Sequence, residues 1–439
     1  MSENNMAVFL THLFDGWNAA GVKYLILRNY EELPKHTDND VDILVSPPQL
    51  KRATVVLQQA AENKGWRIHN VGEFACFTIH LFHEASLEQV HIDLMCGIKW
   101  HALPFIDDQN LLNNRCSFKN FYIPTPAHEA AVNLMTRLIY RGYVKEPYRA
   151  GIKEAAQTNG DLLSEALSPW IGPELAGQFI EWAAADRWNE IEDSSGMVRK
   201  NVLKANCRKP FRFVGLILGD VFRIIHRWAK SPGCSIVFFG PDGCGKSSVA
   251  DELKVALGKS FASEKGLHCH WKPVRPKGTS AGPIEDPHGK PPRNLWFSLM
   301  YFMHHYLPFM WGWWLCVKPV LFKNGLVIID RYYYDFFVDP RRYRLTLPQW
   351  VAKLGYVFVK NPDLVFCLDA EPEILQARKN EVSFEECKRQ REAYRALAET
   401  LPNGHVIDAS QPLEQVAFDV QTIVLEYMAA RAETRMGKS

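Results

Sequence analysis

The apolar residues of this chain are spaced as in strands over some stretches and as in helices over others. The spacing predicts an amphipathic helix over residues 6–20. Strands are then expected at 23–27, 40–45, 67–71, 74–82 and 88–94, with a helix at about 47–64 that opens on two prolines and closes on Gly65. This mixture predicts a small α/β domain built on a mixed sheet.

Helical spacing dominates from about residue 125 to about residue 228. The stretch 208–230 is basic, with polar residues such as Arg212 and Arg223 on one helical side and apolar residues largely on the other. Ser231-Pro232-Gly233 breaks this helix, and the main domain boundary is predicted there. We expect residues 1–122 to form the α/β domain, 123–207 a helical extension, and 208–232 a basic amphipathic helix and linker.

Strands and helices alternate after residue 233, which predicts a parallel sheet with helices on both faces over 233–432. The segment 295–317 contains no Asp, Glu, Lys or Arg and is long enough to cross a bilayer. The strands on either side of it must share one sheet, so a crossing would split one site between two membrane faces. We therefore predict buried crossover helices, with contact to a membrane surface as the alternative.

The composition, net charge and cysteine content indicate which class of protein this is. Of 439 residues, 47% are hydrophobic and 23% charged, as in a soluble globular chain. A net charge of +2 gives no argument for nucleic acid as a partner. The ten cysteines form no C-x-x-C pair, which indicates reduced thiols in a cytoplasmic protein, and residues 1–5 carry no signal peptide. The cluster His268-Cys269-His270 lacks a second ligand pair and is interpreted as incidental.

Residues 240–247 read Gly-Pro-Asp-Gly-Cys-Gly-Lys-Ser, between an apolar strand and a helix. This is G-x-x-x-x-G-K-[ST] in the strand, turn and helix context of a phosphate site. Glycines let backbone N–H groups point at an anion, and the helix N-terminus adds positive potential. The expected phosphate-binding residues are Gly240, Asp242, Gly243, Cys244, Gly245, Lys246, Ser247 and Ser248. Lys246 would reach the outer phosphates and Ser247 would hold Mg²⁺, so ATP and Mg²⁺ are the predicted ligands.

A second pair of candidate residues ends the apolar strand 326–329. Asp330 and Arg331 follow it directly, at the edge where ligands bind in open α/β sheets. Asp330 could hold the water shell of Mg²⁺ or orient the acceptor, and Arg331 could clamp an acceptor phosphate or hydroxyl. The alternative is an ion pair at the end of a strand.

Residues 233 to about 432 resemble thymidylate kinases and their P-loop nucleotide-kinase relatives. The matching segments are 240–247, Asp330-Arg331-Tyr332, Leu368-Asp369-Ala370-Glu371-Pro372-Glu373, Arg391-Glu392-Ala393-Tyr394 and Val406-Ile407-Asp408-Ala409-Ser410. The resemblance implies transfer of the γ-phosphoryl of ATP to a nucleoside monophosphate such as dTMP. The catalytic residues that it implies are Lys246, Asp330, Arg331 and, in a mobile lid, Arg378. Charge neutralisation by such residues is the main catalytic contribution in phosphoryl transfer.

The acceptor side departs from this family. Thymidylate kinases carry an Arg-Glu-Pro-Gly-like segment where this chain has His270-Trp271-Lys272-Pro273-Val274-Arg275-Pro276, and the lid is short on arginine. A divergent branch with Asp-Arg-Tyr-Tyr-Tyr-Asp and an N-terminal extension looks similar and is often linked to surface-polysaccharide synthesis. A sugar or sugar phosphate is therefore the rival acceptor.

Three carboxylates define a candidate site near the N-terminus. Asp40 and Asp42 lie two apart on one predicted strand and so face the same side, with Asp93 as a plausible third. Together they could hold two Mg²⁺ ions for attack on a nucleotide phosphate. Residues 20–200 thus resemble the nucleotidyltransferase superfamily, although Arg28-Asn29 stands where that family usually has Gly-Ser. An active transferase, a ligand-binding relic and a solvated acidic face all remain open.

Three functions follow from these features. The first is an ATP-dependent kinase of a small phosphate- or hydroxyl-bearing acceptor. The second is a two-step kinase and nucleotidyltransferase that makes an activated sugar or polyol. The third is a non-catalytic, nucleotide-switched module that docks to a membrane or partner. We expect a cytoplasmic chain, with peripheral contact at the inner face of the membrane through 295–317 or 208–230, and a homodimer as one option.

Overall fold

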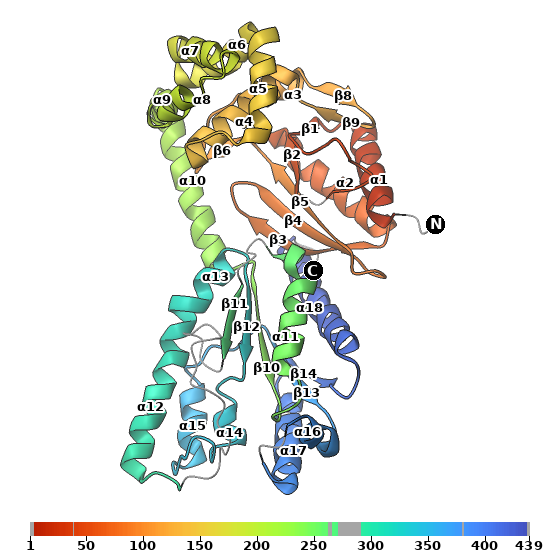
Figure 1. Cartoon of the computed structure of the whole chain (residues 1–439), viewed down its shortest axis with the longest axis vertical. Coiled ribbons are helices and arrows are strands. Elements are labelled where there is room, and N and C mark those ends of the chain that lie inside the picture. The colour runs from red at the N-terminus through yellow and green to blue at the C-terminus, as the bar shows by residue number, and fades with distance from the viewer. Residues whose placement is uncertain (1–3, 38, 262–265, 271–290, 380–381, 437–439) are drawn as a thin grey trace. The chain divides into compact units, whose positions relative to one another are not determined.

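The computed structural model describes residues 4–37, 39–261, 266–270, 291–379 and 382–436 (Figure 1). It divides into two compact units, Met1–Arg227 with Ala432–Ser439 and Trp228–Arg431. Each unit is described by itself.

The first unit contains a five-stranded mixed sheet in the order β1-β2-β5-β4-β3. Its strands are β1 (Tyr24–Ile26), β2 (Val41–Val45), β3 (Trp66–Glu73), β4 (Phe77–His83) and β5 (Gln89–Met95). Strands β2 and β5 run parallel, with Asp42 opposite Asp93, and the other neighbours are antiparallel. Helices α1 (Asn5–Ala19) and α2 (Leu50–Asn63) bury their apolar sides in the same hydrophobic cluster as this sheet. The predicted mixed sheet is confirmed.

Most of the rest of this unit is helical, and its last helix ends just past the boundary with the second unit. The helices are α3 (Asp108–Asn113), α4 (Pro126–Arg141), α5 (Glu146–Thr158), α6 (Gly160–Ile171), α7 (Pro173–Ala184), α8 (Trp188–Asp193), α9 (Ser195–Cys207) and α10 (Pro210–Ala229). Two short hairpins precede α4, formed by β6 (Lys99–Trp100) with β7 (Leu103–Pro104) and by β8 (Cys116–Phe118) with β9 (Phe121–Ile123). The Thr125 side chain caps α4 by accepting from the His128 N–H, and Gly142 ends it with a φ of 81°.

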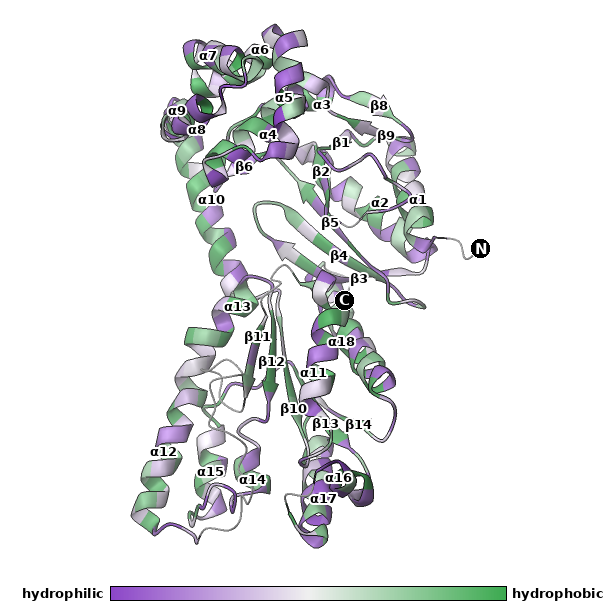
Figure 2. Cartoon of the chain, in the orientation of Figure 1, coloured by the Kyte–Doolittle hydropathy of each residue, from purple (hydrophilic) through white to green (hydrophobic). Residues whose placement is uncertain are grey.

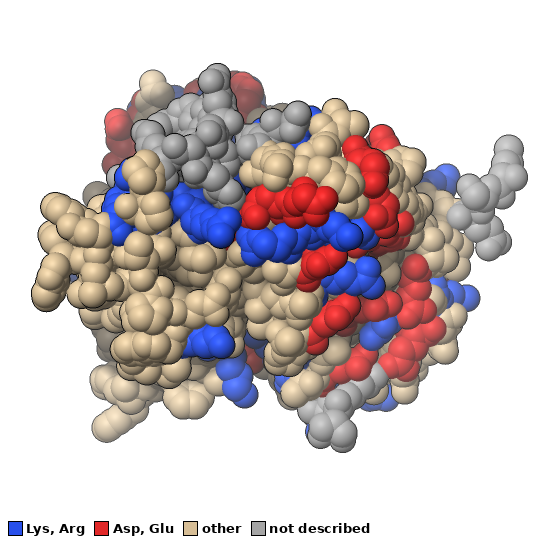
Figure 3. Space-filling model, turned by 90° about the horizontal axis from the view of Figure 1, so that it is seen from below, with Lys and Arg blue, Asp and Glu red and all other residues tan. Residues whose placement is uncertain are grey.

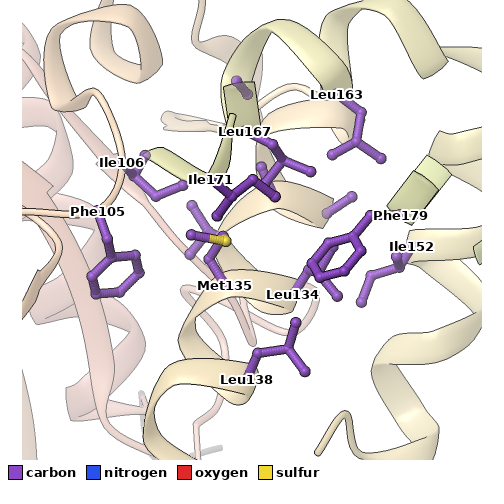
Figure 4. Packing of buried hydrophobic residues seen from close by; sticks show 14 of the residues in the cluster. Phe105, Ile106, Leu134, Met135, Leu138, Ile152, Leu163, Leu167, Ile171 and Phe179 are labelled. Atoms are coloured by element: carbon purple, nitrogen blue, oxygen red, sulfur yellow. The ribbon is translucent and has the colours of Figure 1, made fainter. Parts of the chain in front are cut away.

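Side chains from four of these helices meet in one apolar core (Figure 4). They include Leu134, Met135 and Leu138 of α4, Ile152 of α5, Leu163, Leu167 and Ile171 of α6, and Phe179 of α7. Each helix presents its apolar positions at helical spacing. The same core also contains Leu25 and Leu44 of the sheet, Phe105 and Ile106 before α3, and residues of α8 and α9, so the helices and one side of the sheet share it.

The second unit contains a five-stranded parallel sheet in the order β11-β12-β10-β13-β14. Its strands are β10 (Cys234–Phe239), β11 (Leu267–His270), β12 (Leu326–Asp330), β13 (Leu364–Asp369) and β14 (Gly404–Asp408). Its helices are α11 (Lys246–Ala256), α12 (Leu295–Gly312), α13 (Lys318–Phe322), α14 (Asp335–Val338), α15 (Gln349–Tyr356), α16 (Pro372–Arg378) and α17 (Phe384–Thr400). Helix α18 (Leu413–Arg435) closes the chain. The predicted parallel sheet flanked by helices is confirmed.

The apolar segment 295–317, expected to be buried, is only half buried. Its inner side, including Phe302, Tyr306 and Phe309 of α12, packs in the core of the unit. Its outer side is exposed, with Trp296 76% and Met300 69% accessible. The reason is geometric: the apolar residues of α12 are spread around the helix, and the core of its own unit covers only one side, which also includes Ser298 and His305. Within the described residues, none of the helices combines the length and hydropathy that crossing a bilayer requires.

Candidate active site

The turn between β10 and α11 holds three glycines with positive φ angles. Their φ values are 141° for Gly240, 88° for Gly243 and 87° for Gly245. A Cβ at Gly240 would lie 2.6 Å from the Leu368 carbonyl oxygen, and one at Gly243 would lie 2.7 Å from that of Leu375. Side chains are therefore excluded at two of these positions, and the backbone can approach an anion closely.

Lys246 opens α11 beside this turn. Its Nζ donates hydrogen bonds to the carbonyls of Gly240, at 2.9 Å, and Pro241, at 2.8 Å. The ammonium group thus lies over the loop, next to a helix N-terminus that favours negative charge. Of the other expected loop residues, Cys244 is buried beneath the turn and Ser248 is exposed on α11. A glycine cradle, an ammonium and a helix start fit the phosphates of a nucleotide.

Ser247 and Asp330 come together across two neighbouring strands. The Ser247 hydroxyl donates a 3.0 Å hydrogen bond to Asp330 Oδ2. Asp330 ends β12, which runs parallel to β10, so its carboxylate lies at the strand edge from which the glycine turn departs. Hydroxyl and carboxylate oxygens are ligands that suit Mg²⁺. The pair predicted from sequence to hold Mg²⁺ is therefore brought together.

His268 on β11 is a further neighbour of Asp330. Its Nε2 lies 3.2 Å from Asp330 Oδ1, and its Nδ1 lies 2.6 Å from Lys254 Nζ. From the sequence, this histidine was interpreted as incidental. The signal that could have found His268 is its position on a strand that neighbours β12 in the parallel sheet. The sequence alone did not give the order of the strands in that sheet.

Arg331 links the glycine turn to a buried carboxylate. Its guanidinium donates to Asp242 in the turn and, at 3.2 Å, to Asp335 Oδ2. Arg342 donates to the other oxygen of Asp242 at 2.7 Å. Burial alone would raise the pKa of Asp242, but Arg331, Lys246 and Arg342 hold that pKa well below its usual range. Asp242 is thus an ionised anchor for two arginines.

Asp335 is fully buried and accepts from three donors. Besides Arg331, the phenols of Tyr343 and Tyr394 each donate to it at 3.0 Å. Burial, and then the charge of Asp335, raises the pKa of both phenols. Arg331 also has a left-handed φ of 66°, which a bulky residue rarely adopts. The surrounding network fixes both its backbone and its side chain.

Arg378, the predicted lid residue, ends α16 and donates to the Ala409 carbonyl at 2.9 Å. Lys379, the next residue, lies against the glycine turn, since a Cβ at Gly243 would be 3.3 Å from Lys379 Cβ. Residues 380 and 381 of the predicted lid fall outside the described residues. The segment 270–276, which differs from the acceptor segment of thymidylate kinases, also lies outside the described residues from Trp271 onward.

Comparison with known proteins shows what this part of the chain is similar to. Residues 238–420 match the family model of thymidylate kinase. The C-terminal domain is thymidylate kinase-like. The matched range contains the glycine turn, Ser247, Asp330 and Arg331, and the parallel sheet is consistent with the P-loop fold of that family.

Two individual proteins are also similar to this chain. One from Thermococcus gammatolerans, named a probable thymidylate kinase, is 32% identical over 116 residues, which is 25% of this chain and 55% of that protein. The chain thus spans about half the length of that curated relative. A crystal structure of thymidylate kinase from Ehrlichia chaffeensis is 18% identical, with a TM-score of 0.31, over 44% of this chain and 100% of that one.

The acidic cluster of the first unit differs from the expected three carboxylates. His91 on β5 lies between Asp40 Oδ1, at 2.6 Å, and Asp93 Oδ1, at 3.0 Å. Burial works against the charged imidazole, but the two carboxylates raise the pKa of His91 to about 9. Asp42 is buried beside Asp93 and paired with Arg28, with 2.5 Å between Asp42 Oδ2 and Arg28 Nε.

The same cluster offers ligand atoms to a metal ion. One atom each from Asp40, His91 and Asp93 lies within 4.8 Å of the others. These are oxygen and imidazole ligands that divalent ions accept. Asp42 was expected to join them, but its carboxylate is engaged by Arg28. Sequence reasoning missed His91, although it lies two residues before Asp93 and therefore faces the same side of β5.

Proposed function

We propose that the thymidylate kinase-like domain transfers a phosphoryl group from ATP, with Mg²⁺, to a small phosphate- or hydroxyl-bearing acceptor. The observation that carries this proposal is the 3.0 Å contact of Ser247 with Asp330 beside the glycine turn. Bound there, Mg²⁺ would neutralise charge on the phosphates. The nucleotide kinase chemistry of the matched family supports the same assignment.

Each group of residues in this site has its own proposed role. Lys246 and the glycine turn would hold the outer phosphates of the nucleotide, and Ser247 with Asp330 would hold the ion. Arg331, fixed by Asp242 and Asp335, would orient the acceptor. Because these groups are already in place before the reaction, they would stabilise developing charge with little reorganisation.

We propose a nucleoside monophosphate, with dTMP as the parent example, as the acceptor. A sugar or sugar phosphate is the alternative, favoured by the changed segment after His270. Thermal unfolding with ATP and Mg²⁺ separates the two, because a ligand that binds the native state raises the melting temperature. Nucleoside monophosphates that raise it, where sugar phosphates do not, favour the first acceptor class, and the reverse result favours the second.

Activity measurements test the kinase proposal directly. Purified chain is incubated with ATP, Mg²⁺ and each acceptor, and ADP formation is followed. Lys246→Ala and Asp330→Ala are expected to reduce the rate to background, whereas Lys353→Ala, an exposed position on α15, should leave it unchanged. Wild-type protein that binds no ATP and forms no ADP with any acceptor would overturn the proposal.

For the alternative in which the acceptor is a sugar or polyol, we propose a second activity: the first unit attaches a nucleotide to the phosphorylated sugar or polyol. A phosphate oxygen of that product would attack the α-phosphorus of a nucleoside triphosphate, with pyrophosphate leaving. The observation that favours this is the grouping of Asp40, His91 and Asp93 as ligands for a divalent ion. The overall product would be an activated sugar or polyol of the kind used for surface polysaccharide.

Pyrophosphate release tests this second activity. It is measured with ATP or CTP and a panel of sugar phosphates, for the wild type and for Asp40→Asn and Asp93→Asn. Release that falls to background in both variants supports a transferase. Release that is absent in the wild type, or unchanged in both variants, excludes it and leaves the kinase proposal untouched.

A further inference from the structure

Helix α10 places most of its apolar residues on one half of its circumference and its polar residues on the other, with Leu216 as an apolar residue on the polar half. At about 100° per residue, ten apolar side chains share one half, here called the apolar arc: Phe211, Phe213, Val214, Ile217, Leu218, Val221, Phe222, Ile224, Ile225 and Trp228. The other half carries Arg212, Asp220, Arg223, His226 and Arg227, and Lys230 follows the helix end on the same side. The separation is visible as green and purple along α10 (Figure 2).

The helix turns its apolar arc to solvent. None of its residues is buried, and Phe211 is 94%, Phe222 73% and Leu218 63% exposed. An amphipathic helix of a soluble domain normally turns its apolar side to the core. Here nine large apolar side chains of one helix stay accessible to water, which costs free energy unless something covers them.

The contacts that hold α10 to its own unit come from its polar side. Arg223 Nη1 donates to the Glu73 carbonyl at 3.0 Å, and Arg227 Nη1 donates to the same carbonyl at 3.2 Å. The Arg227 guanidinium also lies 4.4 Å from the centre of the Phe74 ring. The polar side is thus used for docking on the turn between β3 and β4, so the apolar arc points away from that turn.

The charges of residues 208–230 indicate which kind of surface covers the apolar arc. Residues 208–230 contain six Lys or Arg and one acidic residue, Asp220, which pairs with Arg223. The exposed cations lie at both ends, with Arg208, Lys209 and Arg212 at the start and Lys230 at the finish. Two copies of α10 packed arc to arc would bring like charges together at both ends, whereas an anionic surface would attract them.

We propose that α10 binds the surface of an anionic lipid bilayer, with its apolar arc at the boundary between headgroups and acyl chains. Phe, Ile, Leu and Trp side chains suit that depth, and the long stems of Lys and Arg let their charges reach the phosphates. The polar half, held at Glu73 and Phe74, keeps the helix parallel to the surface. The chain is anchored by a helix that lies on the membrane, since its charged half cannot cross.

Flotation with vesicles tests the proposal on the full chain. Vesicles of phosphatidylcholine alone are compared with vesicles of phosphatidylcholine and phosphatidylglycerol in equal parts. Binding to the mixed vesicles is expected, with weaker binding to the neutral ones and a decrease as salt is added. No binding to the mixed vesicles, or equal binding to both kinds, overturns the proposal.

Variants locate the binding surface. Leu218→Gln with Phe222→Gln removes two exposed apolar residues and should weaken binding at least about tenfold. Arg212→Gln with Lys230→Gln should weaken it about fivefold per charge removed. The matched control is Leu162→Gln with Met197→Gln, which changes two exposed apolar residues of α6 and α9 and should not alter binding. Unchanged melting temperatures show that each variant is folded.

Two rival results would overturn the assignment to α10. In the first, Trp296→Gln with Met300→Gln on α12 abolishes vesicle binding while the α10 pair retains it. In the second, the chain binds no vesicles but is a dimer by light scattering, and Leu218→Gln with Phe222→Gln makes it monomeric. That outcome would show that a second copy covers the apolar arc.

Discussion

The hydroxyl of Ser247 donates a 3.0 Å hydrogen bond to the Asp330 carboxylate, and so joins the start of α11 to the end of β12. The two residues are 83 positions apart in the chain. They meet because β10 and β12 are parallel neighbours whose C-terminal ends share one edge of the sheet. An oxygen pair at this edge, next to a glycine turn, is the arrangement on which the proposed phosphoryl transfer depends.

Ser247→Ala is expected to weaken the use of Mg²⁺ without unfolding the domain. The variant removes one oxygen ligand and leaves Asp330 in place, so kcat should fall roughly a hundredfold and more Mg²⁺ should be needed for half-maximal rate. Initial rates over a range of Mg²⁺ concentrations measure both. A variant with wild-type rate and Mg²⁺ dependence would show that Ser247 does not hold the ion.

Asp242→Asn should destabilise the thymidylate kinase-like domain by about 3 kcal/mol, because it leaves a buried arginine with one anionic partner fewer. Arg331 is only 6% exposed and would keep Asp335 alone. Urea unfolding at neutral pH measures the loss. The matched control is Asp251→Asn, whose surface pair with Lys254 should contribute less than about 1 kcal/mol.

We also expect the Asp242 carboxylate to make the stability of this domain depend on pH. The pKa of Asp242 is depressed in the folded chain, so its stabilisation is present above the unfolded value of about 4 and is lost as the pH falls below that value. The wild type should therefore lose stability more steeply in acid than Asp242→Asn does. If the free energy of unfolding falls equally steeply in acid for the two proteins, the prediction is wrong.

Asp108→Asn should stabilise the first unit at neutral pH. Burial raises the pKa of Asp108 to about 6, although its Oδ1 accepts from the Ile98 N–H at 3.0 Å. A raised carboxyl pKa means that stability is full below the unfolded value of about 4 and is lost as the pH rises through about 6. The amide keeps the acceptor and removes the charge, for a gain of up to about 3 kcal/mol at pH 7.

Thermal unfolding at two pH values checks this expectation. Near pH 4 the wild type and Asp108→Asn should unfold at similar temperatures, and near pH 7 the variant should unfold higher. Asp161→Asn, an exposed residue of α6, serves as the control and should show no such divergence. A variant that is less stable than the wild type at pH 7 would contradict the prediction.

Local sequence signals predicted the part of the site that lies close together in the chain. The spacing of Gly240, Gly243, Gly245 and Lys246 defines the phosphate turn, and an apolar run before Asp330 places that carboxylate at a strand end. Such signals depend on a few neighbouring residues and on backbone conformations that glycine alone adopts readily. The parallel sheet followed from the alternation of strands and helices.

Contacts between distant segments were not predictable in this way. Arg342 reaches Asp242 across 100 positions, and His268 meets Asp330 only because β11 is placed next to β12. The periodicity of α10 predicted which of its sides is apolar. It did not predict that this side faces solvent, because that orientation depends on the contact of Arg223 with the distant Glu73 carbonyl. For α12, whose apolar residues are spread around the helix, the sequence alone did not show that the core would cover only one side.

Gly243→Ala should impair the second unit for two separable reasons, a left-handed φ of 88° and a Cβ placed 2.7 Å from the Leu375 carbonyl oxygen. Gly245→Ala shares the conformation, with a φ of 87°, but its Cβ would meet nothing within 4 Å. We expect Gly245→Ala to cost about 1 kcal/mol and Gly243→Ala clearly more, with ATP binding lost because the turn must shift. Unfolding free energies and nucleotide titrations measure both, with Gly177→Ala in α7 as a control that should gain up to about 1 kcal/mol. Equal costs for the two loop variants would show that the close approach to Leu375 does not constrain the phosphate turn.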